Sequence, residues 1–107
     1  MRKVNADRLI KKDAAAGMRE EILGRILDSI KHVEAVEGGY TLRFGSTDED
    51  YVLVADWVQI ERLCNPFLRF TINVESSQGP ITVAMQGPSG TAAFLEQSLS
   101  LGRWMNS

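Results

Sequence analysis

The fold is decided by a change of pattern within residues 61–74, which read Glu61-Arg62-Leu63-Cys64-Asn65-Pro66-Phe67-Leu68-Arg69-Phe70-Thr71-Ile72-Asn73-Val74. Proline lacks an N–H and disfavours helical geometry in the residue before it, so a helix is predicted to end near Cys64. Beyond Pro66, apolar and polar residues alternate up to Val74, which is the period of a half-buried β-strand. This stretch therefore predicts a helix followed closely by a strand.

The helix before Pro66 is predicted to begin at residues 46–49, where a serine and a glutamate three positions later match a capping box. Two apolar rows follow along it, Leu53-Trp57-Ile60-Cys64 and Tyr51-Val54-Ala55-Val58. One face of a sheet covers only one of these rows. The other row is predicted to pack on a second helix or on a partner subunit.

Hairpin patterns lie on both sides of this helix. Residues 33–44 alternate around Gly38-Gly39, and residues 67–85 alternate around a polar turn at 76–79. A further short helix is predicted over about 92–99, and an amphipathic helix over 13–31, with Asp13 as its N-cap. On that first helix, Arg19 is assigned to the polar side.

The predicted fold class is α+β, with two β-hairpin-plus-helix units in the order α-ββα-ββα. The units form a four-stranded antiparallel sheet with the helices packed mainly on one face. A single domain is expected over residues 13–100, between a basic N-terminal arm at 1–12 and a C-terminal tail at 101–107.

Composition limits the classes of function. The 107 residues are 44% hydrophobic and 24% charged, which is typical of one globular domain. The net charge is -2 and the clearest basic cluster is the arm, so nucleic acid is not predicted as a partner. No stretch approaches the roughly 20 apolar residues that span a bilayer, so no membrane partner is predicted. The single cysteine, Cys64, forms no internal disulfide, and a cytoplasmic location is expected.

Residues 61–70 resemble a family of small, largely uncharacterised bacterial proteins that carry Glu-Arg-x-Cys-Cys-Pro-Phe-x-x-Phe. Similar segments lie at residues 39–44, 79–81, 87–90 and 94–95. The resemblance implies no activity that can be transferred. Some relatives accompany heavy-metal-resistance genes, and adjacent cysteines would suit a soft-metal or redox site. In this chain Asn65 stands at the second cysteine position, which leaves a single thiolate ligand.

Three neighbouring residues, Glu61, Arg62 and Cys64, are the candidate ligand or redox site. A helix C-terminus disfavours a thiolate, so Cys64 is interpreted first as a buried structural cysteine. Glu61 and Arg62 are interpreted as a polar pair that anchors the helix end, with ligand binding as the alternative. His32 is interpreted as an ordinary histidine. No catalytic residue, metal ligand set or cofactor is predicted.

Three classes of function stay open. The leading hypothesis is a non-enzymatic binding or interaction module that forms a homodimer, because the second helix carries more apolar surface than one sheet face covers. Its twofold interface would bury the outer row of that helix or pair exposed strand edges. The alternative is a small-molecule or thiol-dependent protein, related to redox or soft-metal chemistry, with a pocket near Cys64, Glu61 and Arg62. A metal-handling protein weakened by Asn65 is a third reading.

Overall fold

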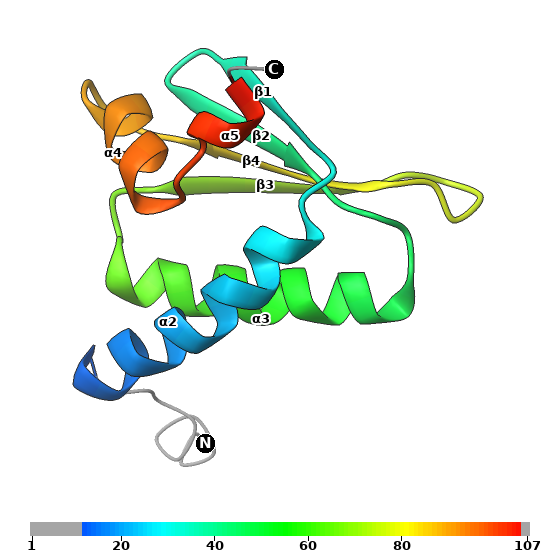
Figure 1. Cartoon of the computed structure of the whole chain (residues 1–107), viewed down its shortest axis with the longest axis horizontal. Helices are drawn as coiled ribbons and strands as arrows, with labels where there is room; N and C mark the ends of the chain where they lie inside the picture. The colour runs from blue at the N-terminus through cyan, green and yellow to red at the C-terminus, as the bar shows by residue number, and fades with distance from the viewer. Residues whose placement is uncertain (1–11, 106–107) are drawn as a thin grey trace, which may run out of the picture.

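The computed structural model describes residues 12–105, and its helices and strands follow the order that the sequence predicts, with one further short helix at the end (Figure 1). In chain order the elements are α2 (Lys12–Ser29), β1 (His32–Val36), β2 (Gly39–Arg43), α3 (Asp48–Cys64), β3 (Arg69–Val74), β4 (Ile81–Gln86), α4 (Thr91–Ser98) and α5 (Gly102–Met105). The predicted α+β class with a four-stranded antiparallel sheet is confirmed.

The sheet has the spatial order β1-β2-β4-β3, so each hairpin supplies one inner and one edge strand. Val33 pairs with Leu42, Leu42 with Val83, and Val83 with Ile72, which places these apolar side chains on one face. Leu42 and Val83 are fully buried. The core therefore lies between this face and the helices.

The turn of the first hairpin needs its two glycines for different reasons. Gly38 has a φ of 76°, a value that L side chains rarely adopt. Gly39 lies so close to β4 that a Cβ atom would be 1.8 Å from the carbonyl oxygen of Met85. The pair thus reverses the chain and allows β2 to approach β4.

Helix α3 runs beneath the sheet and packs against α2 along much of its length (Figure 1). Both predicted apolar rows of α3 contribute buried residues, namely Leu53, Val54, Trp57, Val58 and Ile60. The sheet and α2 together cover these side chains within one chain. In the second row, Val54 and Val58 are buried within the chain, whereas Tyr51 and Ala55 are exposed, as is the neighbouring Val52. Half of the second row therefore has no need of a partner subunit.

The ends of the helices differ from the predictions by small shifts. Helix α3 ends at Cys64 and Asn65 is its C-cap, which confirms Pro66 as the boundary between helix and strand. The capping box lies one residue later than predicted, because Thr47 is the N-cap and Asp50 its reciprocal partner. Asp13 lies inside α2 and is not its N-cap.

The segment expected to be an irregular tail contains structure. Leu101 is fully buried, and α5 follows it and packs against β1. The short helix expected over about 92–99 is present as α4. Residues 1–11 of the predicted basic arm, and residues 106–107, lie outside the described part of the chain.

Candidate functional site

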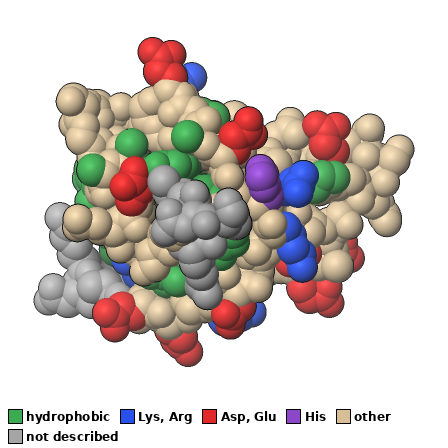
Figure 2. Space-filling view, turned by 45° about the horizontal axis from the view of Figure 1, so that its top comes forward, with side chains coloured by type: hydrophobic (Ala, Val, Ile, Leu, Met, Phe, Trp, Pro, Cys, Tyr) green, Lys and Arg blue, Asp and Glu red, His purple; other side chains and the backbone are tan. Residues whose placement is uncertain are grey.

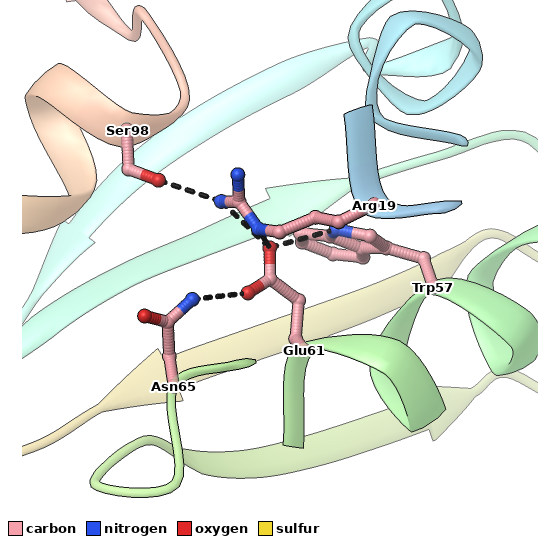
Figure 3. A network of polar contacts seen from close by, with 5 residues as sticks. All are labelled: Arg19, Trp57, Glu61, Asn65 and Ser98. Carbon is pink, nitrogen blue, oxygen red and sulfur yellow. Dashed lines mark hydrogen bonds and ion pairs between the residues drawn. The ribbon is translucent and has the colours of Figure 1, made fainter. Parts of the chain in front are cut away.

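A buried carboxylate in the last turn of α3 gathers polar groups from three helices (Figure 3). Glu61 is 2% exposed. Its Oε2 accepts hydrogen bonds from Arg19 Nε and Trp57 Nε1, both at 3.0 Å, and its Oε1 accepts from Asn65 Nδ2 at 2.7 Å. Arg19 also forms an ion pair with Glu61 and donates from Nη2 to Ser98 Oγ at 2.6 Å. We call these five residues the Glu61 cluster.

The helical spacing of α3 positions most of this cluster. Trp57 and Asn65 lie four residues before and after Glu61, which is about one helical turn in each direction. Arg19 reaches the carboxylate from α2, while Ser98 ends α4. The cluster therefore connects α2, α3 and α4 at the point where α3 stops.

The arrangement suits a structural anchor better than a catalytic acid or base. A buried charge is tolerated only when it is paired and hydrogen-bonded, and Glu61 is both. Both of its oxygens already accept bonds from donors of the protein. A substrate group would have to displace one of these donors before it reached the carboxylate.

The structure separates the three residues predicted as one candidate site. Glu61 points into the core, Cys64 is half-buried against the core, and Arg62 is exposed. The ion-pair partner of Glu61 is Arg19 rather than the neighbouring Arg62. His32 is exposed on β1, and alternation along the strand places it on the face opposite to the core.

Sequence reasoning missed Arg19, which it assigned to the polar side of the first helix. A signal was present: Arg19 lies three residues before Ile22 and seven before Ile26, on the same stripe as these buried residues. Glu61 likewise lies four residues after buried Trp57. Two opposite charges on two core-facing stripes indicate a buried ion pair.

A second polar contact fastens α4 to the sheet. The hydroxyl group of Tyr40, on β2, donates to Glu96 Oε2 at 2.6 Å. This hydrogen bond to Glu96, together with burial and the negative charge of Glu96, raises the pKa of Tyr40 above its ordinary value. The contact holds a neutral phenol against a carboxylate.

Metal binding finds no ready ligand set in the described part of the chain, where no three His, Cys, Asp or Glu side chains gather as a metal site would require. The acidic run at the start of α3 is engaged in capping through Asp50, which accepts from the backbone and the side chain of Thr47. Asp48 and Glu49 are exposed beside it.

Two surface grooves lie away from the Glu61 cluster. One, of about 370 Å³, runs between α2 and α3, with apolar Met18, Ile22 and Ile60 among its lining residues and Arg25 and Asp56 among its charged ones. The other, of about 510 Å³, lies between the start of α3 and the β3–β4 hairpin, where its lining includes Tyr51, Val74 and Gln78.

The face of the molecule shown in Figure 2 carries charged side chains of both signs. On the face shown in Figure 2, acidic and basic side chains of the described residues are interspersed. Within residues 12–105, no helix has the length and hydropathy that crossing a membrane requires.

Comparisons with protein-family models, curated proteins and solved structures found no match to this chain.

Proposed function

We propose that this chain is a non-enzymatic interaction module that acts as a homodimer. The observation that carries the proposal is the exposure of apolar residues along one edge of the sheet. Ile72 and Val74, on edge strand β3, are 41% and 53% exposed. Their neighbours across the ladder, Val83 and Ile81, are almost fully buried.

Such an edge needs either protection or a partner. An exposed strand edge with apolar side chains is a template for pairing, and proteins that avoid pairing protect their edges with lysine, proline, bulges or a covering helix. Strand β3 contains no lysine or proline, and all six of its residues are paired in register with β4. At the other edge of the sheet, α5 packs against β1.

The Glu61 cluster supports the non-enzymatic part of the proposal. Its carboxylate is occupied by three donors of the same chain, in an arrangement that joins helices. The buried carboxylate of Glu61 is therefore assigned a structural role, in which it stabilises the contacts between these helices. The remaining candidates, Cys64 and Arg62, do not share that cluster.

Light scattering across a concentration series from micromolar to millimolar tests the proposal. We expect the measured mass to rise towards twice the 11.9 kDa of one chain. A mass that stays at 11.9 kDa throughout this range would contradict a homodimer.

A further inference from the structure

The backbone of β3 has groups that point outward at regular intervals and meet no further strand in the part of the chain that the structure describes. The N–H of Glu75 donates to the carbonyl oxygen of Pro80, and these two residues form the next pair after Val74 and Ile81 in the register of β3 and β4. In an antiparallel ladder the direction of these groups alternates along the strand. The main-chain groups of Arg69, Thr71 and Asn73 therefore point to β4. Those of Phe70, Ile72 and Val74 point away from the sheet.

The same three outward-bonding residues carry the apolar side chains of the strand. Phe70, Ile72 and Val74 lie opposite Met85, Val83 and Ile81, and so they share the core face. Phe70 is half-buried, while Ile72 and Val74 are exposed. Backbone hydrogen-bonding capacity and apolar surface therefore coincide along the edge.

The strand is complementary to itself when it is paired antiparallel about Ile72. Ile72 then faces its own copy, and Phe70 faces Val74 of the other strand. Each of these pairs joins residues whose N–H and carbonyl groups point outward, which is the hydrogen-bonded type of antiparallel pair. All the outward groups of Phe70, Ile72 and Val74 thus find partners in this register.

Charge selects the same register. With Ile72 at the centre, Arg69 lies opposite Glu75 of the other copy, and both side chains are exposed. Moving the centre to Thr71 puts Asn73 opposite Arg69, and moving it to Asn73 puts Thr71 opposite Glu75. Among these three twofold registers, only the one centred on Ile72 makes two cross-strand pairs of opposite charge, each of which is stabilising.

We infer that β3 pairs with β3 of a second copy in the register centred on Ile72. The inference rests on the proposed function and specifies its interface. The two four-stranded sheets then form one continuous sheet, with both helical layers on the same side. Phe70 of each copy lies beside Val74 of the other, at the mouth of the groove that Tyr51 also lines.

A register-specific disulfide tests this interface in the full chain. Thr71 lies opposite Asn73 of the second copy in a non-hydrogen-bonded pair, where Cα atoms are about 4.5 Å apart. That spacing falls within the roughly 4.4–6.8 Å range of disulfides. In a Cys64→Ala background, Thr71→Cys and Asn73→Cys are made separately, oxidised alone, and oxidised as an equimolar mixture. Glu34→Cys, an exposed position on β1, reports random collision.

We expect efficient cross-linking only in the mixture of the two variants. Cross-linking of Thr71→Cys or Asn73→Cys alone, above the Glu34→Cys level, would overturn the register. A dimer by light scattering without any specific cross-link would overturn the β3 interface and leave the homodimer standing. If the Cys64→Ala protein and the unmodified chain are both found to be monomeric at every concentration, that result would overturn both this inference and the proposed function.

Discussion

The Glu61 cluster and the free edge of β3 treat their polar groups in opposite ways. In the cluster, a buried carboxylate, a guanidinium, an indole, an amide and a hydroxyl are joined by hydrogen bonds within one chain (Figure 3). At the edge, the outward N–H and carbonyl groups of Phe70, Ile72 and Val74 meet no strand among the described residues. One region is complete, whereas the other has the groups that a further strand would use.

This difference shows which polar groups are already bonded within the described chain and which could bond to a further strand. A charged residue within an otherwise apolar helical row attracts a functional interpretation, and Glu61 did so here. Its charge is matched by Arg19, however, which is half-buried, while Glu61 itself is buried. The edge of β3 reads as an ordinary strand in sequence, yet it offers the larger capacity for binding.

The largest expected effect follows from breaking the cluster. Arg19→Leu removes the cation and leaves Glu61 buried without its ion-pair partner, so we expect a loss of about 3 kcal/mol in the free energy of unfolding. The measurement is urea denaturation followed by tryptophan fluorescence at one fixed protein concentration. Arg25→Leu, at an exposed position of the same helix, is the matched control and should change stability by about 0.5 kcal/mol or less.

The double variant Arg19→Leu/Glu61→Leu sharpens this test. Replacing both members of a buried ion pair by apolar residues is often nearly neutral, although Trp57, Asn65 and Ser98 lose a partner here. We expect the double variant to lose less free energy of unfolding than the sum of the losses measured for Arg19→Leu and Glu61→Leu. Strictly additive losses would show that the two residues do not act as a pair.

The fold was predictable from sequence because local signals agreed with one another. Pro66, the glycines at residues 38 and 39, and the two alternating segments each indicate the same hairpin-and-helix order. Errors arose at the margins. The capping box was shifted by one residue because Ser46 and Thr47 are chemically equivalent caps, and periodicity does not choose between them.

The candidate site was less predictable because it depends on contacts between distant segments. Arg19 and Glu61 are 42 residues apart, and only tertiary packing brings them together. Phe67 is an apolar residue just after Pro66, yet it is 44% exposed and packs edge-to-face on Phe94 with ring centroids 5.2 Å apart. The position of β3 at an edge is likewise set by strand order, which hydrophobic periodicity does not report.

The second prediction breaks the free edge. Ile72→Lys places an ammonium group opposite its own copy at the centre of the β3 pair, so we expect the dimer dissociation constant to rise by about a hundredfold. Sedimentation equilibrium measures this constant. Stability of the monomer should hardly change, because Ile72 is already 41% exposed.

Val52→Lys is the matched control for that variant. Val52 is also exposed and apolar, but it lies on α3. We expect the dimer dissociation constant of Val52→Lys to equal that of the unmodified chain. If Val52→Lys weakens the dimer and Ile72→Lys does not, the interface lies on the helical surface and not at the strand edge.

The third prediction tests the charges that set the register. Arg69→Glu and Glu75→Arg each put like charges opposite one another at two symmetric positions, so we expect the dissociation constant to rise roughly tenfold. The double variant restores opposite charges and should return to within about threefold of the original value. Glu34→Arg, which makes the same charge change on β1, should have no effect. Failure of the double variant to recover would contradict the pairing of Arg69 with Glu75.

The smallest expected effect concerns Tyr40, whose hydrogen bond to Glu96 is complete within one chain, like those of the Glu61 cluster. Tyr40→Phe removes this bond and should cost about 1 kcal/mol at neutral pH.

The folded protein raises the pKa of Tyr40, first through the hydrogen bond to Glu96, so it favours the protonated phenol. The stability gained is therefore fully present below the unfolded pKa of about 10 and is lost as pH rises through the higher folded value. Urea denaturation between pH 8 and 11 measures the effect, in a range that the unfolded pKa of about 10 defines. The unmodified chain should lose stability more steeply than Tyr40→Phe above this pKa, while Tyr51→Phe, which alters an exposed tyrosine, should match the unmodified chain at neutral pH. Equal alkaline slopes for the unmodified chain and Tyr40→Phe would show that the bond to Glu96 does not hold the phenol neutral.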